Sequence, residues 1–363
     1  MSNRNWLSLI SAAAGVAIGL ANGAPALARS PVRLHASSAV TVTRLTYKGW
    51  TNCARISNGV VEAIVVPQIG RVMAFQFVGH PESSPIFTNQ DLVGKTGADV
   101  KAGDWANFGG DKLWPSPQSG WLQYIGHTFP PPPEFDGLPQ RLEIVPRGVR
   151  LIVPLSAEFG TDASRTITLR PGESRLYIAQ TIRRTAAPTG KGGQTPLGLW
   201  SVTQTRGDET AYLPLNPKSR FPLGFVTFDG EVRPVLDSPA LPVGWTRSET
   251  MLTVKRDEKT STKLGGDNAA GWIASLYGGT TLFSEHFPPR SPLSYPDGGS
   301  SAEVYTNAGS IAYIELELLG PLQALPVGSQ MTYDIVWKLQ RLPHTPINSA
   351  QAEQLVREAM SKK

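Results

Sequence analysis

A long succession of short segments with alternating apolar and polar residues most restricts how this chain can fold. The alternating runs begin near residue 41 and end near residue 339, and turn residues such as Asn58-Gly59 separate them. A period of two is typical of half-buried β-strands, and an Asn-Gly pair between two such runs predicts a hairpin. Since no strand–helix–strand rhythm interrupts the succession, we expect an all-β fold, a large antiparallel two-sheet β-sandwich.

Two regions depart from this pattern. Residues 79–140 show little periodicity, but they carry aromatic side chains that argue against disorder. Residues 349–363 predict a short C-terminal helix, with Ser349 as its N-cap and an apolar face that docks on the domain. Three mature regions are therefore expected: a flexible lead-in at 29–40, a sandwich domain at 41–342, and a C-terminal linker and helix at 343–363.

The first 28 residues have the features of a secretory signal peptide. Arg4 supplies a positive charge, an apolar run follows, and Ala26-Leu27-Ala28 matches the small-x-small pattern that precedes a cleavage site. An uncleaved anchor helix is the alternative, but the apolar run is short for the roughly 20 residues that a membrane span needs. We expect cleavage after Ala28, a periplasmic or secreted protein, and no membrane span after cleavage.

Composition and spacing exclude several classes of function. The formal net charge of +5 is mild, and the basic residues do not cluster as they would on a nucleic-acid-binding face. Cys53 is the one cysteine, so an internal disulfide and a cysteine-type zinc site are excluded. Because no histidines have HxH or HExxH spacing and no glycine-rich phosphate motif is present, the sequence predicts neither a metal nor a cofactor.

The segment IAYIELELLGP at 311–321 combines strand alternation with ionisable residues. Its period of two places Tyr313, Glu315 and Glu317 on one face, and Ile314 and Leu316 on the other. Acids two residues apart on a strand are roughly 7 Å apart. The polar face is therefore either a solvated surface or a binding surface, and the apolar face belongs to the core.

A second candidate segment, WANFGGDKLWPSPQ at 105–118, mixes aromatic rings with hydrogen-bonding side chains. Aromatic faces beside polar groups suit a sugar ring, whose C–H face is apolar and whose hydroxyls need partners. The alternative is a loop that closes one end of the sandwich with its tryptophans. The candidate ligand-binding residues of this segment are Trp105, Asn107, Asp111, Lys112 and Trp114.

Two further residues are candidates because of their positions on predicted strands. Arg71 begins a strand after a glycine turn and can either hold a hydroxyl or carboxylate of a ligand or remain a surface charge. His286 shares a strand face with Ser284 and is either an acid or base or a structural histidine.

Three blocks of sequence together resemble the DUF4380 family, which is itself similar to the galactose mutarotase-like, or aldose 1-epimerase-like, proteins. These blocks are YKGWTNCARISNGVVEAIVVPQIGRVMAFQFVG at 47–79, FGGDKLWPSPQ at 108–118 and EVYTNAGSIAYIELELLGPLQALPVGSQMTYDIVWKL at 303–339. The resemblance implies a supersandwich whose concave sheet face binds carbohydrate. It also implies that a late-strand Glu, Glu315 or Glu317, takes the proton of the anomeric hydroxyl, while a His, here His286, protonates the ring oxygen.

The expected function is therefore an exported carbohydrate-binding protein, with sugar epimerase activity by Glu/His acid–base catalysis as its enzymatic form. Two alternatives stay open. One is a non-catalytic glycan-binding module, and the other is a glycoside hydrolase or polysaccharide lyase that uses a pair of acids or a tyrosine base such as Tyr305 or Tyr313. The sequence predicts neither the sugar nor the oligomeric state.

Overall fold

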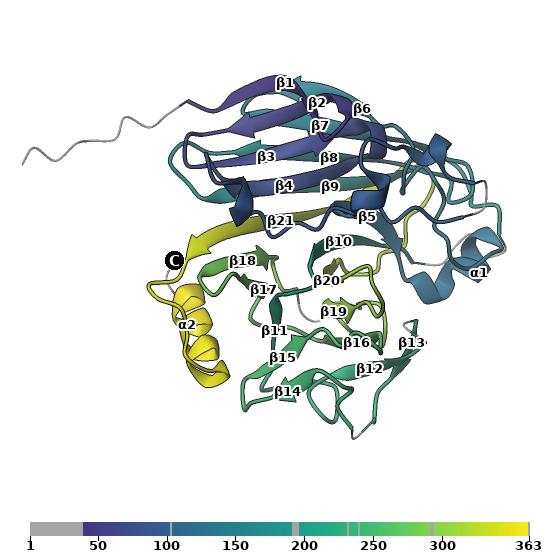
Figure 1. Ribbon diagram of the computed structural model, residues 1–363. Helices are drawn as coiled ribbons and strands as arrows, with labels where there is room; N and C mark the ends of the chain where they lie inside the picture. The colour runs from purple at the N-terminus through teal and green to yellow at the C-terminus, as the bar shows by residue number, and fades with distance from the viewer. Residues whose placement is uncertain are drawn as a thin grey trace, which may run out of the picture. The chain divides into compact units, whose positions relative to one another are not determined.

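The computed structural model describes residues 39–101, 104–190, 196–230, 232–238, 240–290 and 294–361. The predicted signal peptide at 1–28, most of the lead-in, and the last two lysines of the predicted helix lie outside these residues. The described chain forms two antiparallel sheets, so the predicted all-β sandwich is confirmed (Figure 1).

The first sheet has eleven strands among the described residues. In spatial order they are β1 (Thr41–Tyr47), β2 (Trp50–Ser57), β3 (Val61–Val66), β4 (Arg71–Phe77), β5 (Asp111–Ser116), β10 (Gly198–Arg206), β20 (Tyr313–Leu319), β19 (Ala302–Thr306), β16 (Thr262–Gly266), β12 (Val226–Asp229) and β13 (Arg233–Val235).

The second sheet has ten strands in the same part of the chain. In spatial order they are β14 (Trp245–Arg247), β15 (Met251–Lys255), β11 (Thr210–Pro214), β17 (Trp272–Tyr277), β18 (Thr281–His286), β21 (Gln330–Arg341), β9 (Arg175–Arg184), β8 (Thr161–Leu169), β7 (Gly148–Ser156) and β6 (Arg141–Val145).

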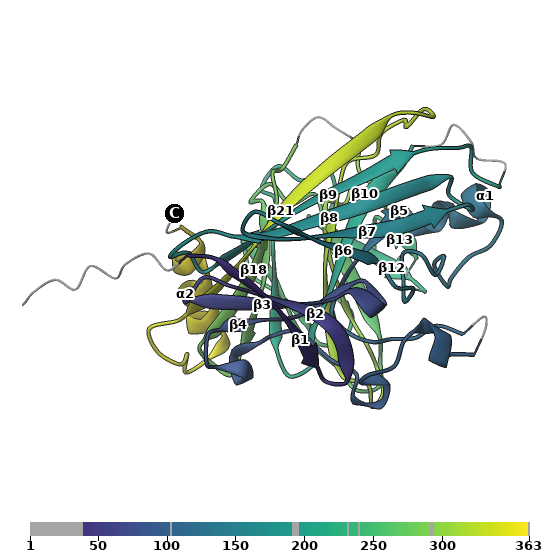
Figure 2. The same cartoon turned by 90° about the horizontal axis from the view of Figure 1, so that it is seen from above.

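The main core lies between the inner faces of the two sheets. Seen from above, β1–β4 form one layer and β6–β9 the other (Figure 2). Side chains from every second position of the strands fill the space between the layers. Along β8, for example, the odd-numbered residues from Thr161 to Leu169 are buried and the even-numbered ones are half-buried. In β20, Ile314, Leu316 and Leu318 belong to this core, as the alternation predicted.

Local sequence signals explain several of the connections. Asn58-Gly59 joins β2 to β3, and the Asn58 side chain accepts a hydrogen bond from the Val60 amide at 3.0 Å. The predicted hairpin is therefore confirmed. The C-terminal helix α2 (Ser349–Ser361) is also confirmed, and it packs Ala352, Leu355 and Val356 against the second sheet. No helix in the described part of the chain is long and apolar enough to cross a membrane.

The irregular region at 79–140 contains a central strand that its sequence does not reveal. Strand β5 lies between β4 and β10, and all of its residues are buried. A strand that is buried on both faces shows no alternation, and the proline at position 115 further weakens its strand signal. The rest of the region forms short 3-10 turns, connecting segments and the helix α1 (Trp121–Ile125).

Candidate functional site

A cavity of about 380 Å³ opens on the outer face of the first sheet, over β5, β10, β20, β19 and β16. We call it the aromatic cavity because six of its lining side chains are aromatic. They are Trp105, Trp114, Phe129, Trp200, Tyr305 and Tyr313. Its polar and charged lining residues are Gln118, Lys263, Asn307, Glu315 and Glu317.

Strand register explains why residues so distant in sequence share this face. Trp114 pairs with Trp200 across β5 and β10, and Tyr305 pairs with Glu315 across β19 and β20. Directly paired residues project from the same side of a sheet, with their Cβ atoms about 5 Å apart. The ladder therefore collects one row of side chains from five neighbouring strands.

The first charged pair of the site joins Lys112 to Glu315. The ammonium nitrogen of Lys112 lies 3.2 Å from Oε1 of Glu315, and the same oxygen accepts a 2.8 Å hydrogen bond from the Gln204 side-chain amide. Lys112 is 1% exposed. Burial lowers its pKa to about 8, although Glu315 opposes the shift. This ammonium can consequently lose its proton near neutral pH.

A second charged group centres on Lys263. Its ammonium nitrogen lies 2.7 Å from Glu303 and 2.9 Å from Glu317. Glu317 also accepts a 2.9 Å hydrogen bond from the Trp200 indole nitrogen. Burial raises the pKa of Glu303 to about 7 and that of Glu317 to about 8, although Lys263 opposes both shifts. Burial thus moves the pKa values of both carboxyl groups beside Lys263 toward neutrality.

Aromatic rings enclose both ammonium groups. The Lys112 nitrogen lies 4.5 Å from the Trp114 ring centroid and 5.4 Å from that of Trp105, and the Lys263 nitrogen lies 4.9 Å from the Trp200 centroid. Cations within about 6 Å of a ring face are stabilised by its quadrupole. The lysines therefore have fixed positions, which holds their carboxylate partners in place as well.

The structure brings together most of the residues that the two candidate segments supplied. Trp105, Trp114, Tyr313, Glu315 and Glu317 all line the aromatic cavity, and Lys112 reaches it through its contact with Glu315. The polar face of β20 is thus the wall of a cavity rather than an open solvated surface.

Besides Lys112, which only contacts a lining residue, four of the predicted site residues do not line the aromatic cavity. Arg71 is buried, donates to the Gly109 carbonyl at 2.7 Å and pairs with Asp136. The backbone carbonyl of Asn107 accepts a 2.9 Å hydrogen bond from the side-chain amide of Asn89, which holds the loop in place.

Asp111 points to the inner face instead, because it precedes Lys112 on a strand and adjacent residues face opposite ways. It pairs there with Arg165 of the second sheet and accepts hydrogen bonds from Ser201 and Thr203, each at 3.2 Å. Its role in the structure is to join the sheets.

His286 lies on β18, in the second sheet, and its ring nitrogen is 2.9 Å from the Ser284 hydroxyl. Burial, with Lys338 and Arg175 nearby, lowers its pKa to about 4. None of the histidines in the described chain lines the aromatic cavity. The suggested pairing of a cavity glutamate with His286 is therefore not formed.

Sequence reasoning missed several contributors to the site, including Phe129 and Asn307 of the cavity lining and three residues of the first sheet. Lys263, Trp200 and Gln204 come from strands whose place in the sheet depends on long-range pairing. Strand alternation could have put Trp200 and Gln204 on a common face, but nothing in the sequence indicates that β16 lies beside β19. Across the described residues, no group of three His, Cys, Asp or Glu side chains is placed to hold a metal ion.

Comparison with solved structures identifies the fold. No protein-family model matches the sequence, and no curated protein matches it. Among solved structures, a galactose mutarotase-like protein from Lactobacillus casei superposes with a TM-score of 0.54 at 11% identity, covering 79% of this chain and 100% of that one. A putative aldose 1-epimerase from Escherichia coli K12 superposes with a TM-score of 0.51 at 11% identity, covering 84% and 100%. The chain therefore has a galactose mutarotase-like β-sandwich fold.

Proposed function

We propose that this protein binds a carbohydrate in the aromatic cavity. The observation that carries the proposal is the combination of Trp105, Trp114 and Trp200 with Glu315 and Glu317 around one opening. Indole faces pack against the C–H face of a sugar ring, and fixed carboxylates accept hydrogen bonds from its hydroxyls. The cavity volume of about 380 Å³ lies within the range of small-molecule sites.

The fold supports the same ligand class, since the two similar structures are described as a galactose mutarotase-like protein and a putative aldose 1-epimerase. Export to the periplasm or the medium after cleavage at Ala28, and membership of the DUF4380 family, are further parts of this proposal. Both rest on sequence features alone: the N-terminal signal pattern and the three similar blocks.

Aldose 1-epimerase-like isomerisation is a second candidate function. Burial raises the pKa of Glu317 to about 8, which favours this function because a carboxyl group with a pKa near neutrality can exchange a proton with a ligand. Since His286 is in the other sheet, the acid and base would both come from the cavity, from Glu317 and from Glu315 or Lys112. A non-catalytic module would bind the sugar without accelerating anomer exchange.

Calorimetry and NMR against a panel of aldoses test the proposal. We expect saturable binding of at least one sugar, and Trp114→Phe should weaken it about tenfold, or about 1.4 kcal/mol. Trp272→Phe is the matched control, because Trp272 packs near the C-terminal helix on the second sheet. Absence of binding to every sugar, or equal effects of the two substitutions, would contradict the proposed site.

The same samples separate binding from catalysis. Accelerated exchange between anomers that is lost in Glu317→Gln, but retained in Glu358→Gln on the exposed side of α2, would support isomerisation. Binding with an unchanged exchange rate would leave the carbohydrate-binding proposal standing and reject the epimerase one. Release of reducing sugar from oligosaccharides would instead indicate hydrolysis.

A further inference from the structure

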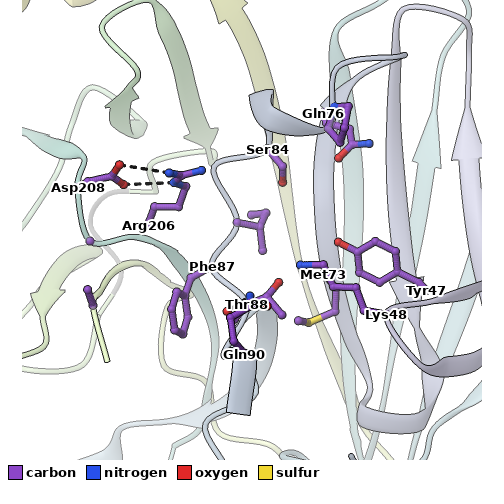
Figure 3. Close-up of a pocket in the computed structure, with 14 residues that line it drawn as sticks. Tyr47, Lys48, Met73, Gln76, Ser84, Phe87, Thr88, Gln90, Arg206 and Asp208 are labelled. Atoms are coloured by element: carbon purple, nitrogen blue, oxygen red, sulfur yellow. Dashed lines mark hydrogen bonds and ion pairs between the residues drawn. The ribbon is translucent and has the colours of Figure 1, made fainter. Parts of the chain in front are cut away.

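A second and larger cavity, of about 570 Å³, lies on the first sheet and has no part in the site described above. We call it the distal cavity. Figure 3 shows Tyr47 and Lys48 on one side of it and Arg206 and Asp208 on the other, with Phe87 and Thr88 between. Met73 and Gln76 of β4, together with Ser84 and Gln90, are the other labelled residues of its lining.

The distal and aromatic cavities are neighbours on one face of the same sheet. Arg206 of β10 lines the distal cavity, and its direct cross-strand partner on β20, Tyr313, lines the aromatic cavity. Ala312, one residue before Tyr313, again lines the distal cavity. Since paired residues are about 5 Å apart, the linings of the two cavities meet at this strand pair.

A pair of aromatic rings lies where the two linings meet and forms a partition between them. The centroids of Phe87 and Tyr313 are 5.5 Å apart with an interplanar angle of 31°. Phe87 lines the distal cavity and Tyr313 the aromatic one, so each ring belongs to one side of the partition. Aromatic rings at such a boundary offer stacking surface to groups on both sides.

The partition is held rigidly by backbone hydrogen bonds. The Phe87 amide donates to the Gln204 carbonyl at 2.9 Å, and the Phe87 carbonyl accepts from the Gly110 amide at 2.9 Å. Gly109 has a φ of +87°, and a Cβ there would collide with the Phe87 carbonyl. The double glycine therefore lets the Phe87 segment lie directly against the residues that precede β5.

The distal cavity has the mixed chemistry that a sugar unit requires. Tyr47, Met73 and Phe87 give apolar surface, and Lys48 and Gln90 give hydrogen-bond donors. The Arg206 guanidinium is held by Asp208 through two contacts of 3.2 Å and lies 4.0 Å from the Tyr277 ring. Asp208 thus occupies the Nε and Nη2 donors, and the remaining N–H groups of this fixed guanidinium can donate to ring hydroxyls.

From these observations we propose that the ligand is an oligosaccharide whose neighbouring units occupy the aromatic cavity and the distal cavity, on either side of the Phe87–Tyr313 partition. This rests on the proposed function, because it assumes that the aromatic cavity takes a sugar. It adds that a single monosaccharide fills only part of the site.

Saccharides of different length that are built from the same sugar test this directly. Glucose, galactose, mannose, xylose and galacturonic acid are each compared by calorimetry with their di- and trisaccharides. We expect at least one series in which the di- or trisaccharide binds about tenfold or more tightly than its monosaccharide. The double variant Lys48→Asn/Gln90→Ala should reduce this advantage at least severalfold, and asparagine is chosen because position 48 has a φ of +46°.

Two more variants test whether the length advantage depends on the partition. Phe87→Leu should also lower the affinity for the longer saccharides, since it removes half of the partition. Lys259→Asn, on an exposed loop, should change the affinity for neither length.

The outcomes distinguish the two proposals. Binding that is independent of chain length, or a length advantage that survives the Lys48/Gln90 variant, would overturn the oligosaccharide inference and leave carbohydrate binding intact. If no saccharide of any length binds, the proposed function itself fails.

Discussion

Lys112 and Glu315 come from strands that do not touch each other, yet their charged groups meet over the strand between them, with Nζ 3.2 Å from Oε1. The residue of β10 that pairs with Lys112 is Val202, which leaves room for the lysine to reach across. This contact fixes a buried ammonium beside Trp114 and ties β5 to β20 on the face that carries the aromatic cavity.

Replacement of Lys112 should change how stability depends on alkaline pH. Burial lowers the pKa of Lys112 from 10.5 to about 8, so between these values the unfolded chain holds a proton that the folded protein has released. As pH rises from 8 to 10.5, the free energy of unfolding of the wild type should therefore increase relative to that of Lys112→Met. Urea denaturation across this range measures the difference, with exposed Lys259→Met as control. Parallel curves for wild type and Lys112→Met would contradict the assignment.

Lys263→Met should be more damaging, because it leaves two buried carboxyl groups without their shared cation. Breaking a buried ion pair typically costs about 3–5 kcal/mol. The loss should be larger at pH 9 than at pH 6, since the pKa values of Glu303 and Glu317 are raised to about 7 and 8 and both groups are mostly protonated at pH 6. Denaturation midpoints at the two pH values give the comparison, and a loss that is equal at both would argue against charged partners.

The sequence predicts the fold and one wall of the site well, because both depend on local alternation. The strict period of two at 313–319 is sufficient to separate Tyr313, Glu315 and Glu317 from the core residues between them. Asp111 and Lys112 show the limit of the same reasoning. They are adjacent in the sequence. Only when β5 is recognised as a strand does it follow that Asp111 faces the second sheet and Lys112 faces the side of the cavity.

The remaining site residues depend on which strands become neighbours. Lys263 meets Glu303 because β16 lies beside β19, and His286 is remote because β18 belongs to the second sheet. Both placements result from pairings between segments that are far apart in sequence. Composition and periodicity assign a residue to a strand and to a face, but not to a sheet.

Substitution of His286 should separate its structural role from the sugar site. Burial lowers its pKa from 6.5 to about 4, so the unfolded chain binds more protons between these values and the wild-type free energy of unfolding rises with pH through that window. His286→Gln should lose this contribution and leave saccharide affinity unchanged, whereas Glu317→Gln should weaken binding. Denaturation between pH 4 and 6.5 and calorimetry at neutral pH measure the two effects. If His286→Gln lost as much affinity as Glu317→Gln, His286 would have to take part in saccharide binding.

The pairing of Asp111 with Arg165 predicts that this aspartate matters for the fold rather than for the ligand. Both side chains are at most 1% exposed, and they join β5 of the first sheet to β8 of the second. Asp111→Asn would leave the guanidinium buried without its anion, so we expect the free energy of unfolding to fall by about 3–5 kcal/mol.

Asp162→Asn is the matched control, because Asp162 pairs with Arg183 at the surface, where an ion pair is screened by water and contributes little. Chemical denaturation of the two variants gives the comparison. The double variant Asp111→Asn/Arg165→Met should be less destabilised than the sum of its single changes, since removal of both charges leaves neither unpaired. Additive losses, or equal losses at positions 111 and 162, would show that the inter-sheet pair does not stabilise the sandwich.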